Sequence, residues 1–390
     1  MRRLFLVANT FFLVGVVLDA IAPVFWILLL GRAVQGFGTG IALPLMYNII
    51  LEQVPRSKIG MMMGVGTLIT GIAPAIGPTY GGLIVSLLSW RWIFIILLPV
   101  LMFLLVLGAL CVQQSSKLAS THVDAPSIAL IVVAFVGLVF GMSNLGTTVF
   151  LSLKVDGSLI VGTVALLLFT HRSNRLTYPV LNLRPFIILA FTEHVIGFWL
   201  FQMCSLGLSF VLPNYLQLVN GVTALAAGLI VLPGAAVGAV LAPISRQLYD
   251  HFGARRPIQV GVSFAVLGVL GLFLAGNQIS NGIIIVFYLV YMLGVGLSFG
   301  NVLTNALAQL GPTQQADGNA IMTTLQQIAA AMGTSLASAV VASGQAARTI
   351  QTTGTALGSH WAMAMLVGFV VIGQVTLTLA LRPHKQSFKV

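Results

Sequence analysis

Four polar side chains inside hydrophobic segments are the residues of this chain that could do chemistry. Arg32 and Gln35 lie in the string LLLGRAVQGFGTG, and Glu193 and His194 are neighbours in a later hydrophobic segment. A charge in lipid is costly unless it faces a polar interior, and such residues commonly lie on ion or substrate paths. A buried carboxylate or imidazole can also load and release a proton. We therefore predict a role in transport or proton coupling for these four residues.

Each of these residues also has a simpler interpretation. Arg32 lies six residues after Trp26, about 9 Å along a helix, so its long side chain could reach the lipid headgroups. Counted from Pro185, Glu193 lies about 12 Å along its helix, near the middle of a ~30 Å hydrocarbon core. With these boundaries Glu193 and His194 are the only carboxylate and imidazole well inside a predicted span. A helix that begins later would leave them at the membrane surface.

The composition predicts an all-α polytopic membrane protein. The chain has 390 residues, of which 58% are hydrophobic and 6% are charged, and its mean hydropathy is +1.05. Apolar stretches of about 20 residues are long enough to cross a bilayer. Twelve such stretches lie near residues 4–22, 26–50, 62–88, 92–113, 127–149, 156–171, 186–212, 223–243, 257–276, 282–310, 320–343 and 361–381.

The distribution of basic residues predicts the orientation. Lys and Arg concentrate in cytoplasmic loops, and twelve spans place 14 of the 18 Lys and Arg residues on one side. The short stretch at 156–171 must cross for this asymmetry to hold. We therefore expect a multi-pass protein of the cell membrane with both termini in the cytoplasm. The net charge of +11 follows from these loops, which carry no basic run with interleaved aromatic residues, so no nucleic-acid partner is expected.

Glycine and proline motifs predict closely packed, bendable helices. Gly36 and Gly40 lie on a face similar to that of Arg32 and Gln35, and a second motif, GIAPAIGPTYGG, follows. Small residues at this spacing let helices approach closely, and proline weakens the helical hydrogen bonds. Ordinary helix packing is the alternative. The residues with a predicted conformational role are Gly36, Gly40, Pro74, Gly77, Pro78, Gly81 and Gly82.

An internal repeat and a charged loop connect the two ends of the chain. The segment from Arg2 matches the segment from Arg255 in two arginines, a valine and a phenylalanine. Asp250, Gly253, Arg255 and Arg256 precede or begin the second copy, and we predict that they form a cytoplasmic latch whose ion pairs break during transport. A solvated surface ion pair, worth only ~0–1 kcal/mol, is the alternative.

One motif points to an enzyme. Ser298 lies in GLSFG, which matches the G-x-S-x-G string of hydrolases, but the surrounding residues predict a helix and not the required strand–turn–helix. The chain shows no cluster of metal-ligating residues and no third glycine of a dinucleotide loop after Gly36. We expect no enzyme activity, no cofactor and no metal, and an intramembrane hydrolase through Ser298 remains a remote alternative.

Taken together, these motifs resemble those of the major facilitator superfamily, and within it the fourteen-span drug:proton antiporters of the EmrB/QacA type. Residues 32–38 resemble the fourth-span motif of that family, and residues 74–82 resemble the fifth-span motif of exporters. Residues 90–94 resemble the start of the next span, and residues 250–256 resemble the loop motif. Leu97 and Ala73 depart from the residues usual in the family.

The resemblance implies a major facilitator fold and proton-coupled efflux of drugs or lipophilic cations by alternating access. It divides the chain into an amino-terminal bundle of four spans at 1–117, a two-span insert at 118–176 and a six-helix bundle at 177–390. Relative to the family, the first bundle lacks two spans. Two alternatives stay open: a transporter of a specific metabolite, or a truncated chain that does not transport. The implied partners are a drug-like substrate, protons and the lipid bilayer.

Overall fold

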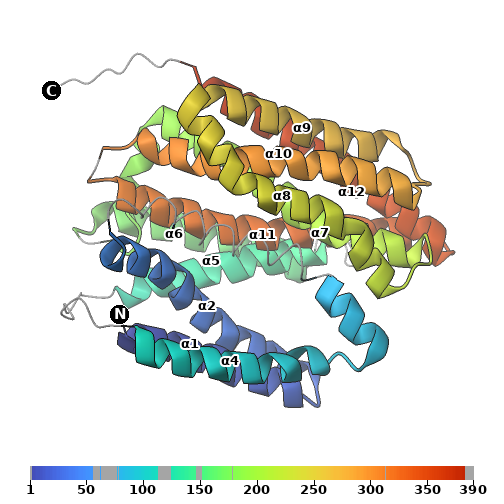
Figure 1. Ribbon diagram of the computed structural model, residues 1–390, viewed down its shortest axis with the longest axis horizontal. Helices are drawn as coiled ribbons and strands as arrows, with labels where there is room; N and C mark the ends of the chain where they lie inside the picture. Colours follow the sequence, from blue (N-terminus) through green and yellow to red (C-terminus); the bar gives the residue numbers. More distant parts are fainter. Residues whose placement is uncertain are drawn as a thin grey trace. The chain divides into compact units, whose positions relative to one another are not determined.

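The secondary structure of the described residues is helical (Figure 1). The computed structural model describes residues 2–55, 62, 77, 79–112, 124–145, 152–177, 179–311 and 313–382. Within them, eleven helices are long and apolar enough to cross a bilayer. The predicted all-α polytopic class is confirmed. The remaining predicted span, at 62–88, lies mostly outside the described residues.

The chain forms two compact units. The first comprises residues 1–121 together with 223–228. In it, α1 (Arg2–Ile21) packs against both α2 (Phe25–Gln53) and α4 (Trp92–Cys111). Its core consists of buried Val16, Ala20 and Phe94, with Phe12, Leu28, Leu98 and Leu101 packed around them.

The second unit comprises residues 122–222 and 229–390. Its helices are α5 (Ala125–Asn144), α6 (Ser158–Arg175), α7 (Leu189–Leu218), α8 (Ala224–Phe252, whose first residues belong to the first unit), α9 (Arg255–Leu274), α10 (Asn281–Ala308), α11 (Gln315–Ala346) and α12 (Gln351–Ala380). α7 packs against α10, α11 and α12, and α9 packs against α10 and α12.

Within the second unit, α5 packs against α11, and α6 packs against α5. Met203 of α7 and Ile328, Ala329 and Met332 of α11 form a buried cluster, and side chains of α5 pack against it, among them Phe135, Val139 and Met142. The Ser143 hydroxyl donates to the Ser335 hydroxyl at 2.9 Å. The first of the two predicted insert helices, α5, is thus joined to α7 and α11 by both apolar and polar contacts.

Two helices are longer than the hydropathy pattern predicts. The short stretch at 156–171 is extended at its start by a π-helical turn, Leu153–Gly157, so the whole helical segment runs to Arg175 and has 23 residues. That length is sufficient to cross a bilayer. α12 begins at Gln351, ten residues before the predicted span, because its first turns are polar and their hydropathy is low. Hydropathy finds the part of a helix that lies in lipid and misses the ends.

The internal repeat is present in the helix packing. α1 begins at Arg2 and α9 at Arg255, and each has 20 residues. A Cβ added to Gly15 of α1 would lie 2.6 Å from the carbonyl oxygen of Gly31 in α2. A Cβ added to Gly268 of α9 would lie 2.7 Å from the carbonyl oxygen of Phe287 in α10. The pair α1–α2 and the pair α9–α10 therefore make the same close approach at equivalent positions.

This register shows where the two copies differ. Glycines equivalent to each other, Gly38 and Gly294, also make equivalent close contacts with the partner helix. The same alignment pairs three polar residues of the first copy with uncharged residues of the second, namely Asp19 with Leu272, Arg32 with Tyr288 and Gln35 with Tyr291. The charges at Asp19 and Arg32 thus have no equivalent in the second copy.

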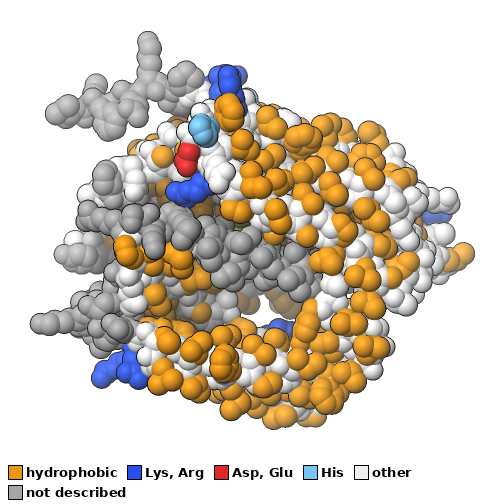
Figure 2. Space-filling model, in the orientation of Figure 1, with side chains coloured by type: hydrophobic (Ala, Val, Ile, Leu, Met, Phe, Trp, Pro, Cys, Tyr) orange, Lys and Arg blue, Asp and Glu red, His pale blue; other side chains and the backbone are white. Residues whose placement is uncertain are grey.

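Hydrophobic side chains cover the helices on the face shown in Figure 2. Large apolar residues are exposed along the helices, for example Phe103 and Leu110 on α4 and Leu167 on α6. Exposed apolar side chains of this density are suited to contact with lipid chains. The apolar surface and the length of the helices both indicate that the helices cross a membrane.

Candidate functional site

The centre of the candidate site is Asp19, a carboxylate near the end of α1. Its side chain is completely buried. Arg32 of α2 forms an ion pair with it, with 3.3 Å between Nε and Oδ2. Gln35 donates from Nε2 to the same Oδ2 at 2.8 Å, and Arg32 Nη1 donates to Gln35 Oε1 at 3.2 Å. The three side chains form a closed triangle of charge and hydrogen bonds, in which Gln35 contacts both charged groups.

The local sequence explains why these groups meet. α1 ends at Ile21 and α2 begins at Phe25, so a turn of three residues reverses the chain and places the two helix ends side by side. Gly15 and Gly31 let the helix backbones approach closely. At the turn, Arg91 Nη2 donates to the carbonyl oxygen of Ala22 at 2.9 Å. This bond ties the start of α4 to the end of α1.

Arg32 combines a buried contact with an exposed face. Its side chain is 57% exposed, and its guanidinium carbon lies 4.9 Å from the centre of the Phe94 ring. A cation over an aromatic face is stabilised by the ring quadrupole. The guanidinium can therefore interact with two protein groups as well as with solvent, namely the Asp19 carboxylate and the Phe94 ring. An arrangement of this kind suits a cation that exchanges partners.

Asp19 was not among the predicted site residues. It is a further carboxylate within a helix long enough to cross a bilayer, two residues before the end of α1. The available signal was a carboxylate within a predicted span, 13 residues before an arginine in the next one. A turn of three residues makes the two helices a hairpin, so polar residues close to the turn on either helix can come into contact. Gln35 and Arg32, which were predicted, are brought together with it.

The structure separates Glu193 from His194 by environment. α7 begins at Leu189, so Glu193 lies about 6 Å from its start and not the 12 Å expected from Pro185. Glu193 is half-buried, whereas His194 is completely buried. The His194 ring contacts the carbonyl oxygen of Ala190 at 2.6 Å and the amide nitrogen of Asn305 at 2.7 Å. The later helix start, which the sequence left open, is the one found.

The predicted glycine positions differ in their packing. A Cβ on Gly82 would collide with the backbone of Ala224 and Leu225. Among the described residues, a Cβ on Gly36, Gly40, Gly77 or Gly81 would meet nothing within 4 Å, and the close-packed glycines of α2 are Gly31 and Gly38. Pro74 and Pro78 lie outside the described residues. The conformational role of this set stays a prediction.

The loop between α8 and α9 is a tight turn centred on a glycine. Gly253 has φ +73, a left-handed conformation that residues with a Cβ rarely adopt. Arg256 lies over the Phe252 ring, with 6.0 Å between its guanidinium carbon and the ring centre. Among the residues that the structure describes, no ion pair joins Asp250 to Arg255 or Arg256. The predicted latch remains a prediction.

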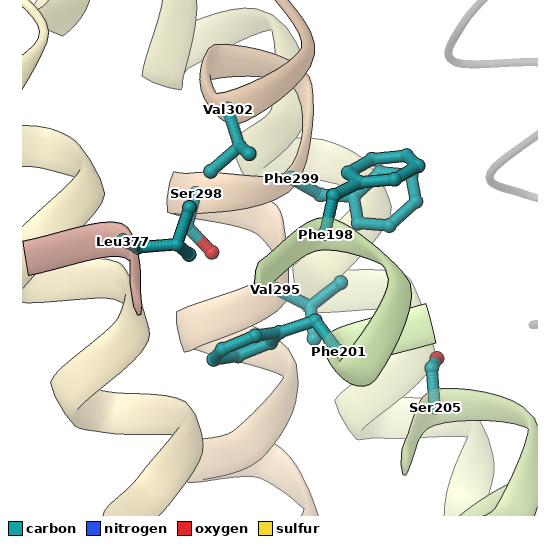
Figure 3. A pocket seen from close by; sticks show the side chains of 8 residues that line it. All are labelled: Phe198, Phe201, Ser205, Val295, Ser298, Phe299, Val302 and Leu377. Atoms are coloured by element: carbon teal, nitrogen blue, oxygen red, sulfur yellow. The ribbon is translucent and has the colours of Figure 1, made fainter. Parts of the chain in front are cut away.

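Ser298 lies in a helix and not in a nucleophile turn. Its hydroxyl donates to the carbonyl oxygen of Gly294 at 2.7 Å, one turn earlier on α10. It borders a cavity between α7, α10 and α12, together with Phe198, Phe299 and Leu377 (Figure 3). The cavity is about 10 Å³, room for no more than one water molecule. Neither a hydrolysis substrate nor a drug fits there in this conformation.

Comparison with known proteins identifies the family. Residues 1–334 match the Major Facilitator Superfamily. The chain is 38% identical to the lincomycin resistance protein LmrB of Listeria monocytogenes over 87% of this chain and 72% of that protein. It is 39% identical to LmrB of Bacillus subtilis over 86% and 70%. The multidrug efflux pump LfrA of Mycolicibacterium smegmatis is 28% identical over 85% of this chain and 66% of LfrA.

Solved structures share the fold at low sequence identity. A bacterial homologue of the human lysosomal transporter Spinster, in an inward-facing conformation, has a TM-score of 0.63 at 15% identity, covering 97% of this chain and 82% of that one. A peptide transporter of the POT type in complex with sulfate has a TM-score of 0.63 at 16% identity, covering 97% and 80%. With the family match and the membrane-spanning helices, the conclusion is that the chain belongs to the Major Facilitator Superfamily and is a multi-pass membrane transporter, not an enzyme.

Proposed function

We propose that this transporter exports drug-like molecules in exchange for protons, as a member of the fourteen-span drug:proton antiporters. The names of its relatives, lincomycin resistance protein and multidrug efflux pump, support drug export. The motif around Arg32 and the pair of helices α5 and α6 support the fourteen-span type. Its substrates are lipophilic drugs, including cations, and its other partners are protons and the lipid bilayer.

The buried carboxylate of Asp19 is the observation that carries the coupling proposal. An ionised carboxylate in a buried position needs partners, and Arg32 and Gln35 supply them through the Oδ2 atom. A proton on Asp19 removes its charge and leaves Arg32 without its ionic partner. Arg32 is then held only by the Phe94 ring and Gln35. Protonation of one group thus changes the position of a cation at the junction of three helices, α1, α2 and α4.

The orientation of the helices supports proton loading from outside the cell. With both termini in the cytoplasm, as the loop charges favour, α1 runs outward from Arg2. Asp19 lies near its far end, in the outer half of the membrane. A proton entering from outside would meet Asp19 early, and antiport requires such a site to load a proton from outside. Glu193, near the opposite end of its helix, is proposed as a second charged group that meets cationic substrate from the cytoplasm.

Efflux from a host that lacks its own drug pumps tests the proposal. Cells or everted vesicles carrying the chain should expel ethidium and confer lincomycin resistance, and dissipation of the proton gradient should stop the efflux. Asp19→Asn and Arg32→Gln should each lower proton-driven efflux by about tenfold or more, equivalent to roughly 1.4 kcal/mol per factor of ten. Glu193→Gln should lower the efflux of cationic drugs and spare neutral ones.

Arg175→Gln is the matched control, because Arg175 is an exposed arginine in the last turn of α6. It should transport like the unmodified chain at equal expression. Efflux that continues after the proton gradient is dissipated would reject proton coupling and keep drug export. Full proton-driven efflux by Asp19→Asn would remove this carboxylate from the coupling site. Unchanged efflux of cationic drugs by Glu193→Gln would exclude that residue from the mechanism.

A further inference from the structure

The imidazole of His194 makes two hydrogen-bonding contacts, one at each ring nitrogen. Nδ1 lies 2.6 Å from the carbonyl oxygen of Ala190, and Nε2 lies 2.7 Å from Nδ2 of Asn305. A carbonyl oxygen only accepts hydrogen bonds, so Nδ1 carries the hydrogen. The amide Nδ2 of Asn305 only donates, so Nε2 is the acceptor. With Nδ2 of Asn305 facing the ring, the contacts fit a neutral imidazole with its hydrogen on Nδ1.

The Asn305 side chain also forms a hydrogen bond with a residue of a third helix, α8. Its Oδ1 accepts a hydrogen bond from the Tyr249 hydroxyl at 3.3 Å. His194 is near the start of α7, whereas Tyr249 and Asn305 are each near the last turn of α8 and α10. These three ends lie on the same side of the membrane, the cytoplasmic side by the loop charges. The chain His194–Asn305–Tyr249 therefore joins three helices at one end of the second unit.

Protonation of His194 would reverse the donor and acceptor roles in the hydrogen bonds that join His194, Asn305 and Tyr249. Protonated Nε2 becomes a donor, and it would then face the donor Nδ2 of Asn305. Rotation of the Asn305 amide by about 180° presents Oδ1 to Nε2 and Nδ2 to the Tyr249 hydroxyl. The hydroxyl can accept as well as donate, so both contacts of the Asn305 side chain are remade in the opposite direction. The Asn305 side chain thus has two bonding patterns, one for each protonation state of His194.

A neighbouring contact keeps α8 and α10 together in both patterns. Asn301 lies one turn before Asn305, and its Nδ2 donates to the Ser245 hydroxyl at 2.6 Å and to the Leu297 carbonyl oxygen at 2.9 Å. These bonds involve no titratable group. Reversal at Asn305 therefore acts on the contact of α7 with the α8–α10 pair and leaves the pair itself anchored.

We propose that His194 is a proton sensor of the transporter. Its protonation changes the hydrogen bonds of Asn305 and Tyr249, and these bonds determine how α7 packs against α8 and α10 at the cytoplasmic end. The inference rests on the proposed transport function and adds a second protonatable position to it. The charged and titratable groups of the elements at this end are Glu193 on α7, Arg184 in the turn Arg184–Ile187, Arg246, Tyr249, Asp250 and His251 on α8, Asp317 on α11 and Arg382 on α12, while α10 has none.

Variants of His194 and Asn305, the two partners of the hydrogen bond, distinguish a proton-sensing role from a purely structural one. Everted vesicles expose the cytoplasmic face to the bath, so each variant is compared with the unmodified chain at each bath pH. His194→Gln cannot take a proton, and its efflux should lose the pH-dependent part while retaining activity. Asn305→Asp supplies an acceptor and a negative charge, which favour protonated His194, so its pH profile should move to higher pH by about one unit. Tyr249→Phe should make the profile shallower.

Thr304→Ala is the matched control, because Thr304 is exposed and its hydroxyl bonds only to Gly300 of its own helix. Its profile should equal that of the unmodified chain. A normal profile for both His194→Gln and Asn305→Asp would overturn the inference. Absence of drug efflux from the unmodified chain would instead contradict the proposed function.

A direct measurement does not depend on transport. Nitrogen NMR of ¹⁵N-histidine-labelled protein, with the His194 signal identified by its loss in His194→Gln, reports which ring nitrogen is protonated. The expected spectrum at alkaline pH shows hydrogen on Nδ1 and none on Nε2, and at acidic pH it shows both nitrogens protonated. Hydrogen on Nε2 at alkaline pH, or no titration, would contradict the network.

Discussion

Gly31 and Asp19 are in direct contact: the backbone of Gly31 in α2 leaves no room for a Cβ beside the Oδ1 atom of Asp19 in α1. The glycine therefore makes space for the buried carboxylate. Its equivalent in the second repeat is Phe287, where no carboxylate has to be accommodated. The contact links a backbone property of α2 to a charge on α1.

Gly31→Ala should displace Asp19 and lower proton-driven efflux by about tenfold, close to the loss expected from a missing charge partner, equivalent to roughly 1.4 kcal/mol. The added methyl group would also meet the backbone of Gly15 at 2.9 Å. Gly36→Ala tests the same motif five residues later, where a Cβ meets nothing within 4 Å among the described residues. Ethidium efflux at matched expression should distinguish them. Equal losses in both variants would show that the glycines act through helix flexibility and not through Asp19.

The ion pair of Asp124 with Arg172 should stabilise the helix pair α5–α6 down to acidic pH. Arg172 donates from Nε and Nη2 to the two carboxylate oxygens at 2.8 and 2.7 Å. These bonds, with a further one from Ser127, hold the pKa of the Asp124 carboxyl well below its ordinary value of 3.8. Because the folded-state pKa is lowered, the stabilisation is present above pH 3.8 and disappears as the pH falls towards the folded-state pKa.

Asp124→Asn should therefore lower the thermal unfolding temperature of the detergent-solubilised protein at pH 7 and at pH 5. The difference from the unmodified protein should shrink below pH 3.8. Asn174→Ala, at an exposed position near Arg172, serves as the control and should not show this pH dependence. A difference that grows on acidification would contradict the assignment.

Ser298→Ala should leave efflux and stability close to those of the unmodified chain. The lost hydrogen bond runs to a carbonyl group of the same helix, and such bonds add little to helix stability. Gly296→Ala, two residues earlier, should be harmful instead, because its Cβ would lie 2.6 Å from the carbonyl oxygen of Gly238 in α8. Drug resistance and the unfolding temperature measure both. Loss of transport in Ser298→Ala would reopen a chemical role for this hydroxyl.

Reporter fusions test the orientation. Fusions after Arg175 and at Val390 should report the cytoplasm, because the loop charges place both there. A fusion after Asn277, between α9 and α10, should report the outside. A reversed signal at any of these sites would overturn the topology and, with it, the proposed loading of Asp19 from outside.

Composition and hydrophobic length were sufficient to predict the helical architecture. A chain with long apolar stretches can form all its backbone hydrogen bonds in lipid as helices. The twelve apolar stretches therefore predicted the eleven helices described. The arginines at Arg2 and Arg255 predicted the repeat, since each pair begins an equivalent helix. The helix ends were predicted less well, as at Gln351, because polar turns continue a helix beyond the lipid without a hydropathy signal.

The site was only half predictable, because its parts are joined by distances that no local pattern records. Arg32 was easily recognised because it is a charged residue within an apolar string. Asp19 was missed because it ends a very hydrophobic segment, whose composition is that of an ordinary span. His194 was predicted as a residue but not as a network, since Asn305 lies 111 residues away. Asparagine and tyrosine in a helix have no distinctive spacing. Their role becomes visible only when α7, α8 and α10 are placed together.

The three-residue turn between α1 and α2 has a consequence for how the protein enters the membrane during synthesis. An isolated arginine or aspartate within a span is costly to insert, up to ~2.5–3.5 kcal/mol at the centre of a helix. Asp19 and Arg32 are 13 residues apart on either side of this turn, so the two helices can leave the insertion machinery as one hairpin with the charges already paired. The ion pair would then assist biogenesis before it takes part in transport, and Asp19→Asn with Arg32 left in place should reduce the amount of inserted protein.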